Sequence, residues 1–358
     1  MADDDVTQPP PPMARSGARE WTACRYADVL AVLADSRFEV PAAVPVVPAG
    51  PAVPAGPAVP AVPAVPAGPV GTLSWLRASV SRFANGAEHR QRRARAVAEL
   101  RLLDPGQLRQ AAHRRATALM TAAARPGQRF DAMALLARRV PMTVMAASLG
   151  ITHPQEAADA AITIAAGYFP GSDPEAERRA DAATARLADL LSPAGADLIA
   201  ARIALMVQGC DATAGLIGLA LRLLQDAGQQ YADWPAGAVL DQVLWLTPVV
   251  RASRRIARVP AGVNGGPRVG AGDSVVCDIE AAHRDPAAPG HSASRGAVPP
   301  TLTFGSGLRP CPGRAQALAL AAGVVEAVRE RGTFLPGQRV DYESSPLRIP
   351  ARLEVVLR

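Results

Sequence analysis

Residues Phe304–Gly313 of this chain read FGSGLRPCPG and form a ten-residue loop. Glycine and proline fill half of its positions and exclude a regular helix or a central strand there. Apolar residues then recur at helical spacing from Arg314 to Arg331, which predicts a helix directly after the loop. The loop therefore presents one thiol, Cys311, close to the positive end of a helix dipole, where a thiolate is favoured over a thiol.

The spacing of the cysteines limits what this thiolate can bind. The chain has four cysteines, and no two of them form a C-x-x-C pair, which excludes a zinc ribbon or a thioredoxin motif. A thiolate without a neighbouring His or Cys can still be the single protein ligand of a haem iron, because the porphyrin supplies the other four ligands. A lone cysteine is more often a buried apolar residue, but the composition of the loop around Cys311 argues against that interpretation.

The loop resembles the haem-binding signature F-x-x-G-x-R-x-C-x-G of the cytochrome P450 family, and every fixed position of that signature is filled. The resemblance covers about residues 20–358. It implies a mainly α fold with small β-sheets, cytochrome P450-like, that binds haem b (iron protoporphyrin IX). The residues of the loop that the resemblance places at the haem are Phe304, Gly305, Arg309, Gly313 and, as axial iron ligand, Cys311.

Basic side chains elsewhere match positions that bind the haem propionates in this family. The segment Glu88–Arg93 is similar to the family's C-helix, in which a His and an Arg four residues on, here His89 and Arg93, contact the propionates. The residues after Pro248 resemble a strand that carries a further propionate-binding Arg, and we favour Arg255 over its neighbour. Anionic propionates require cations, and a guanidinium stays charged and donates two hydrogen bonds at once.

The long apolar run from Ala196 to Gln225 departs from the family pattern A/G-G-x-D/E-T-T, because residues 208–213 read QGCDAT. In the family, the acid and the first Thr of this pattern deliver protons during oxygen activation. Gly209 and Asp211 are retained, but Ala212 replaces the Thr. Proton transfer then depends on Thr213, a substrate hydroxyl or an ordered water. The predicted catalytic residues are Gly209, Asp211 and Thr213.

A second departure precedes Pro248. The family carries E-x-x-R there, a buried ion pair in the haem-binding core, whereas residues 242–245 read QVLW. Loss of both charges together is physically coherent, since removing one partner strands a buried charge and replacing both can be neutral. Gln242 can hydrogen-bond and Trp245 can fill volume. The nearby stretch AAHRDP at residues 281–286 is similar to the family's A-A-N-R-D-P.

Composition along the chain predicts its organisation. Residues 1–19 are acidic and then proline-rich, which predicts a disordered tail, and residues 20–358 are expected to form a single haem-thiolate domain. An insert at residues 41–70 carries proline at every third position from Pro45 to Pro69, the period of polyproline II. We interpret this insert as repeat expansion in a tolerant loop, with a partner-binding motif as the alternative.

The interval between Ile151 and Gln208 is too short for the full F, G and H helices of the family.

Other features indicate the compartment. No run of 18 apolar residues lacks charge, Pro and Gly, so no membrane-spanning helix is expected. The start of the chain lacks the basic residues and apolar run of a signal peptide. With few cysteines, the chain is expected in a reducing cytoplasm.

Three functions are compatible with these observations. The first is a haem-thiolate monooxygenase that acts on a small, secondary-metabolite substrate and receives electrons from NAD(P)H through a reductase and an acidic ferredoxin, which docks at Arg90–Arg95. The second is a P450-like haem protein with other chemistry (peroxide-driven, coupling or rearrangement) or with a sensor or scaffold role. The third, a nucleic-acid binder, rests on the basic balance alone; at 4% aromatic residues the Arg clusters lack interleaved aromatics.

Overall fold

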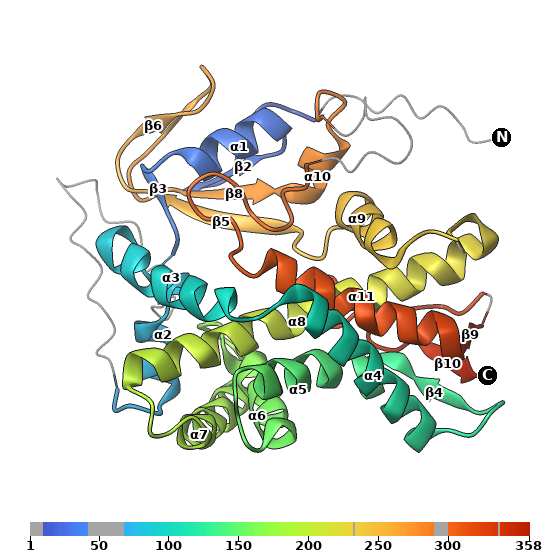
Figure 1. Ribbon diagram of the computed structural model, residues 1–358. Coiled ribbons are helices and arrows are strands. Elements are labelled where there is room, and N and C mark those ends of the chain that lie inside the picture. The colour runs from blue at the N-terminus through green and yellow to red at the C-terminus, as the bar shows by residue number, and fades with distance from the viewer. Residues whose placement is uncertain (1–9, 42–67, 232, 290–299, 336) are drawn as a thin grey trace. The chain divides into compact units, whose positions relative to one another are not determined.

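The computed structural model describes residues 10–41, 68–231, 233–289, 300–335 and 337–358. They form two compact units, each of which is described by itself. The sheet unit comprises Met1–Pro41, Asp241–Cys311 and Pro346–Arg348, and the helical unit comprises Ala42–Leu240, Pro312–Ser345 and Ile349–Arg358. A single haem-thiolate domain over residues 20–358 stays a prediction. Figure 1 shows the elements of both units.

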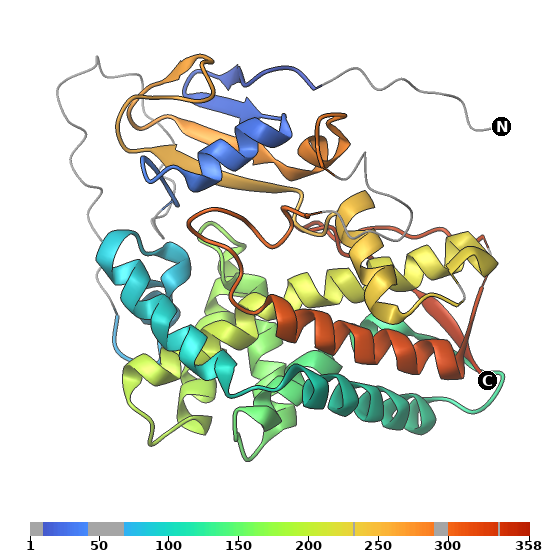
Figure 2. The same cartoon turned by 45° about the horizontal axis from the view of Figure 1, so that its top comes forward.

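The sheet unit is built on a five-stranded sheet of order β1-β2-β8-β5-β3, in which β2 and β8 run parallel and the other neighbours run antiparallel. Alternate residues of the central strands, such as Trp21 and Val275, are buried, as the period of two in a strand requires. Helix α1 lies along this sheet (Figure 2) and buries Val29, Val32 and Leu33. The elements of this unit are β1 (Ala14–Gly17), β2 (Glu20–Ala23), α1 (Tyr26–Ala34), β3 (Phe38–Glu39), β5 (Ala252–Ala257), β6 (Ala261–Gly262), β7 (Arg268–Val269), β8 (Ser274–Asp278) and α10 (Ile279–Arg284).

The N-terminal residues correct one expectation. The sequence predicts a disordered tail over residues 1–19, but Ala14–Gly17 form β1 and pair with β2. Met13 is buried at 4% exposure, so an apolar side chain anchors this strand where composition alone indicated disorder. Residues 1–9 lie outside the described part of the chain.

The helical unit is organised around α8 and α11. Helix α11 packs along α4, as Figure 1 shows; a Cβ on Gly323 of α11 would meet the Arg109 carbonyl oxygen of α4. The α4 side chains Arg109 and His113 pair with Glu326 and Glu330 of α11. The helices of this unit are α2 (Leu73–Ser79), η1 (Ser81–Phe83), α3 (Gly86–Arg101), α4 (Pro105–Ala123), η2 (Met133–Ala137), α5 (Arg139–Ser148), α6 (Pro154–Gly167), α7 (Pro174–Leu190), α8 (Ala196–Ala227), η3 (Gly228–Tyr231) and α11 (Arg314–Arg331), and α9 (Ala236–Leu246) continues into the sheet unit.

A small antiparallel sheet completes the helical unit, with the order β4 (Arg129–Asp131), β10 (Glu354–Leu357) and β9 (Gly332–Phe334). Helical spacing of apolar residues predicts one helix over residues 130–149, whereas the structure has β4, the π-helical turn η2 and then α5. The reason is tertiary: Phe130 pairs with Val355 of β10, a partner that no local pattern can reveal.

Helix α8 is long and apolar enough to cross a membrane by length and composition, but 72% of its most apolar window is buried inside the protein. Burial of this kind is typical of a core helix. The interval between α5 and α8 holds two helices, α6 and α7, in agreement with the predicted shortening of the F–H region. The prolines from Pro45 to Pro66 and residues 290–299 lie outside the described residues.

Candidate active site

The loop that carries Cys311 is folded back on itself. The backbone N–H of Cys311 donates to the Phe304 carbonyl oxygen at 2.6 Å, and the N–H of Gly305 donates to the Leu302 carbonyl oxygen at 2.8 Å. Gly307 has φ +61°, and a Cβ there would collide with the Leu33 carbonyl oxygen at the end of α1, so only glycine fits. Cys311 is exposed, and the loop therefore presents an accessible thiol on a tightly defined backbone.

The residues just before this loop are tied to the C-terminal end of α9. The hydroxyls of Thr301 and Thr303 donate to the Leu244 carbonyl oxygen at 3.2 and 3.0 Å. The backbone N–H of Leu302 donates to Nε2 of His283 at 2.9 Å. These bonds fix the segment that leads into Phe304 and so orient the start of the Cys311 loop.

His283 occupies the Asn position of the A-A-N-R-D-P stretch and lies against Trp245, which occupies the Arg position of E-x-x-R. The two rings stack with centroids 4.6 Å apart and 16° between their planes. Because Nε2 accepts from Leu302, we assign the proton to Nδ1, which lies 3.2 Å from the Trp245 carbonyl oxygen and donates to it. Burial lowers the pKa of His283 to about 4, so the neutral ring is maintained. The uncharged stack of Trp245 on His283 therefore replaces the buried charge that the Arg of E-x-x-R brings in the family pattern.

Arg255 is the candidate propionate ligand of the sheet unit. Its side chain is on strand β5 and is 7% exposed, and its Nη1 donates to the Ser253 hydroxyl at 2.7 Å and to the Arg254 carbonyl oxygen at 2.9 Å. Arg254 points to the other face of the strand and pairs with Glu20 at 3.2 Å. This difference supports the choice of Arg255 over Arg254. Arg309 and Phe304, also in this unit, are half-buried.

His89 and Arg93 lie in α3 four residues apart, on the face that also carries the buried Ala96 and Leu100. The far end of this face packs on the start of α11: a Cβ on Gly313 would lie 3.8 Å from the Leu100 side chain. Both predicted propionate ligands therefore project from a face of α3 that packs on Gly313, the residue directly before α11.

The predicted oxygen-binding segment lies in the middle of α8. Gln208 is exposed, and Gly209 and Ala212 are half-buried, on a helix whose other faces are largely buried. A Cβ on Gly209 would meet no atom within 4 Å, so there is open space beside this glycine. Thr213, one helical turn after Gly209, is 2% exposed, and its role in proton transfer stays a prediction.

Asp211 is held in an ion-pair network that the sequence did not predict. Nε of Arg138 donates to Oδ1 of Asp211 at 2.8 Å, and Nη1 and Nη2 of Arg138 donate to Glu343 at 2.9 and 2.6 Å. Burial lowers the pKa of Arg138, but hydrogen bonds from the two carboxylates outweigh this effect and hold the pKa above its usual value. Arg138 directly follows the π-helical turn η2. No local signal marks either partner, because Glu343 lies 205 residues away.

Two of the remaining cysteines, Cys210 and Cys277, are buried, and burial raises the pKa of both thiols, that of Cys277 to about 12. Within the part of the chain that the structure describes, no group of three or more His, Cys, Asp or Glu side chains is placed to hold a bare metal ion. Taken unit by unit, the donor types suit an iron porphyrin: the sheet unit carries an accessible thiol for the metal and guanidinium groups for propionates, and the helical unit carries an imidazole and a guanidinium for propionates.

Comparison with solved structures identifies the fold. The chain is similar to CalO2 (TM-score 0.75, 20% identity, 97% of this chain and 93% of that chain covered). It is also similar to P450BioI in complex with hexadec-9Z-enoic acid ligated acyl carrier protein (0.72, 17%, 94% and 92%) and to CYP154A1 from Streptomyces coelicolor A3(2) (0.70, 20%, 94% and 91%). The chain therefore has the cytochrome P450 fold. No family model and no curated protein matches the sequence.

Proposed function

We propose that this protein is a haem-thiolate oxidoreductase of the monooxygenase type, with Cys311 as the axial ligand of haem b and a small, secondary-metabolite substrate. The observation that carries the proposal is the Cys311 loop, an exposed thiol on a backbone fixed by Gly307 and by the hydrogen bond from Cys311 to Phe304, within a chain of P450 fold. When bound, the haem supplies oxygen activation, which the thiolate promotes by donating electron density to the iron.

The side chains around the cofactor have distinct tasks in this proposal. His89, Arg93, Arg255 and Arg309 bind the two propionates, and Phe304, Gly305 and Gly313 shape the loop against the porphyrin. Gly209 leaves the open space that a small ligand such as oxygen needs beside α8. Asp211 holds negative charge next to that space and can pass a proton only when it is released from Arg138, because the carboxylate oxygen accepts from the guanidinium at 2.8 Å.

Electrons are proposed to come from NAD(P)H through a reductase and an acidic ferredoxin in the cytoplasm. The docking surface is the basic run Arg90–Arg95 of α3. Part of its charge is neutralised locally, since Arg92 pairs with Glu88 at 3.1 Å and Arg95 with Asp197 at 2.7 Å. Arg90 is exposed on the same helix and is the side chain that we expect to contribute most to docking.

The absorption spectrum of the purified protein tests the haem assignment. We expect a Soret band and, after reduction under carbon monoxide, the red-shifted band of thiolate ligation. Cys311→Ser should abolish that shifted band, whereas Cys24→Ser, which changes a half-buried cysteine outside the loop, should leave it unchanged. A protein that stays colourless after reconstitution with haem would contradict the proposal.

The second candidate is a P450-like haem protein that does not perform standard monooxygenation. Two observations favour it: Ala212 brings no hydroxyl to the accessible stripe of α8, and Asp211 is engaged by Arg138. Comparing NADPH consumption with product formation, using a surrogate ferredoxin and reductase, separates the two. Turnover that stays uncoupled on every substrate tried would favour this second candidate over the first.

A further inference from the structure

Three aromatic side chains gather beside the accessible stripe of α8. Tyr168 lies 5.4 Å from Phe83 and 5.5 Å from Phe169, measured between ring centroids, and Phe83 and Phe169 are 6.4 Å apart. Tyr168 is 2% exposed, while Phe169 is 43% exposed. The cluster therefore has a buried base and an apolar edge that is accessible to a ligand.

Arg77 holds the backbone of this cluster in place. Its guanidinium donates to the carbonyl oxygens of Gly167, Tyr168 and Phe169 at 2.7 to 3.0 Å and pairs with Glu177 at 2.8 Å. Three carbonyl oxygens and one carboxylate are thus satisfied by a single side chain. The aromatic edge is preorganised, which reduces the entropy lost when a ligand is bound.

Arg82 adds a positive charge to this edge. Its guanidinium carbon lies 5.7 Å from the ring centroid of Phe83 and 5.7 Å from that of Phe169. Although the residue is exposed overall, desolvation by neighbouring atoms lowers the pKa of Arg82. A partly desolvated guanidinium attracts an anion more strongly than one in bulk water.

No carboxylate of the described residues forms an ion pair with Arg82, in contrast to Arg77 next to it. Within the described residues, Arg82 is therefore a cation on an aromatic edge without an ion-paired acid, a combination that suits a ligand with both a ring and a carboxylate.

Tyr168 connects this edge to the predicted oxygen-binding segment. Nε2 of Gln208 donates to the Tyr168 hydroxyl at 3.2 Å, and Gln208 directly precedes Gly209. Gln208 is exposed, so its amide oxygen and second N–H face the accessible side of α8. A ligand held at Arg82 and the aromatic edge would extend along Gln208 towards Gly209.

We propose that Arg82, together with Phe83 and Phe169, recognises the carboxylate and ring of an aromatic carboxylic acid, and that this is the substrate class of the site. The inference rests on the proposed haem-thiolate function for what happens to the bound acid. Binding of the aromatic acid depends only on side chains of the helical unit and does not require the haem. Gln208, positioned by Tyr168, hydrogen-bonds the part of the substrate nearest to Gly209.

The test compares three probes of one shape: 3-phenylpropionate, 3-phenylpropanamide and 3-phenylpropan-1-ol. Each is titrated into the purified full-length protein, with binding followed by calorimetry and by the shift of the Soret band. We expect the acid to bind about tenfold more tightly than the amide or the alcohol, the contribution of one charge-assisted contact. Arg82→Gln should remove this preference while leaving amide binding unchanged, and Arg82→Lys, which keeps the charge, should retain part of it.

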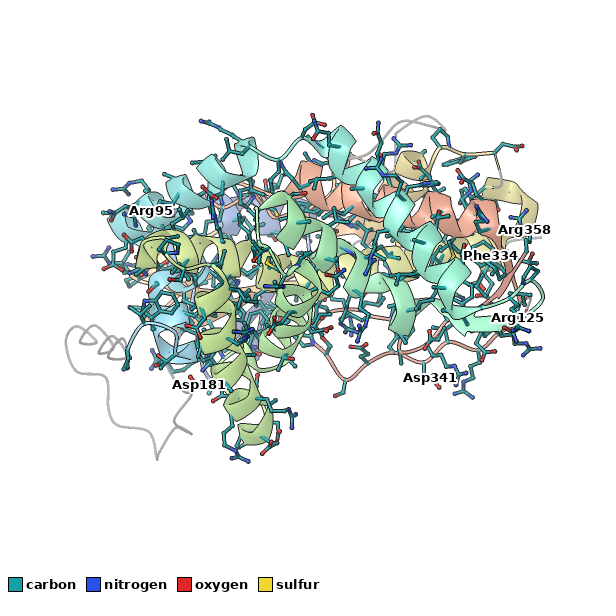
Figure 3. The ribbon with its side chains drawn as sticks, turned by 60° about the horizontal axis from the view of Figure 1, so that its bottom comes forward. Arg95, Arg125, Asp181, Phe334, Asp341 and Arg358 are labelled. Atoms are coloured by element: carbon teal, nitrogen blue, oxygen red, sulfur yellow. The ribbon has the colours of Figure 1, made fainter. Side chains whose placement is uncertain are left out.

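Arg125→Gln is the matched control, because Arg125 is an exposed arginine at the turn between α4 and β4. Figure 3 places it at the opposite end of the helical unit from Asp181, whose carboxylate accepts from Leu73 at the start of α2. This variant should keep the acid preference. Equal affinity for the acid and the amide, absence of binding by all three probes at millimolar concentration, or the same loss in Arg125→Gln would each overturn the inference.

The calorimetric and spectral readouts separate this inference from the proposed function. A preference for the acid in calorimetry without any Soret band supports the carboxylate site and contradicts the haem assignment. A normal Soret band with no preference for the acid supports the haem assignment and contradicts the carboxylate site.

Discussion

The indole of Trp245 stacks on the imidazole of His283, with ring centroids 4.6 Å apart and planes 16° from parallel. The two residues stand at two positions where the chain departs from the family pattern, the Arg of E-x-x-R and the Asn of A-A-N-R-D-P. Their contact gives one physical account of both departures. The stack, with the bond from Leu302 to His283, joins α9, α10 and the segment before the Cys311 loop without a buried charge, which avoids the desolvation cost of an ion pair.

Trp245→Leu should therefore weaken the sheet unit. We expect a loss of about 2 kcal/mol in the free energy of unfolding, because a large buried side chain loses its packing and its stacking partner. Urea unfolding monitored by circular dichroism measures this. His283→Asn restores the family's residue, and a double-mutant cycle should show that the two losses are less than additive. Fully additive losses would mean that the stack carries no coupling energy.

The stability of the protein should decrease in mild acid because of His283. Its pKa is lowered to about 4 from an ordinary value of 6.5, so the unfolded chain binds more protons than the folded one between these values. The contribution of the neutral ring is fully present above about pH 6.5 and is lost as the pH falls to about 4, a total of about 3 kcal/mol. Unfolding measured from pH 7 to pH 4 checks this. His283→Gln should flatten the pH dependence, and an unchanged slope would contradict it.

Arg138→Gln should destabilise the helical unit and leave Asp211 and Glu343 without their shared cation. The three side chains are between a fifth and a third exposed, so we discount the cost of a broken buried pair to about 1–2 kcal/mol. Chemical denaturation gives the value. Adding Asp211→Asn and Glu343→Gln to the same chain removes the stranded charges and should recover part of the loss. If Arg138→Gln alone has no effect, the network does not contribute to stability.

Two glycines of α8 should respond to alanine in opposite directions. Gly209→Ala should raise the free energy of unfolding by about 1 kcal/mol, because its Cβ would meet no atom within 4 Å and alanine favours a helix. Gly218→Ala should lower it by about 1–2 kcal/mol, because its Cβ would lie 2.6 Å from the Met133 sulfur and 3.0 Å from Pro350 Cδ. Thermal unfolding of the two variants compares them directly. A Gly218→Ala variant that is more stable than the unmodified protein would show that Met133 and Pro350 can move away from the added Cβ.

Ala212→Thr should improve coupling of NADPH consumption to product in the loaded enzyme. The half-buried Ala212 lies next to Asp211 on the accessible stripe of α8, where a hydroxyl can hold a water for proton transfer. The ratio of product to NADPH measures the gain. Ala227→Thr makes the same change at a half-buried alanine at the end of α8; it is the matched control and should leave coupling unchanged. Unchanged coupling in Ala212→Thr would contradict the prediction.

Much of the fold followed from local pattern. The helix after the loop was predicted over residues 314–331 and is found there, because apolar spacing and a glycine before its first residue define it locally. Where partners lie far along the chain, the local pattern is wrong. It predicts a helix at residues 130 and 131, and only pairing with β10 makes them a strand. It predicts a disordered tail at residues 14–17, and only pairing with β2 orders them.

In the candidate site, too, some features follow from local sequence and others from contacts between distant residues. Glycine and proline restrict the backbone of the Cys311 loop directly, so the loop and its thiol follow from the sequence, although the distant residues Leu33, Leu244 and His283 hold it in place. Contacts between separate elements follow only from the tertiary structure: His283 meets Trp245 across 38 residues, Asp211 meets Arg138 across 73, and Gln208 meets Tyr168 across 40. The physical reason is that a thiolate loop depends on local backbone geometry. A ring stack, an ion-pair network or a shared hydrogen bond depends on how separate elements pack, and no local pattern encodes it.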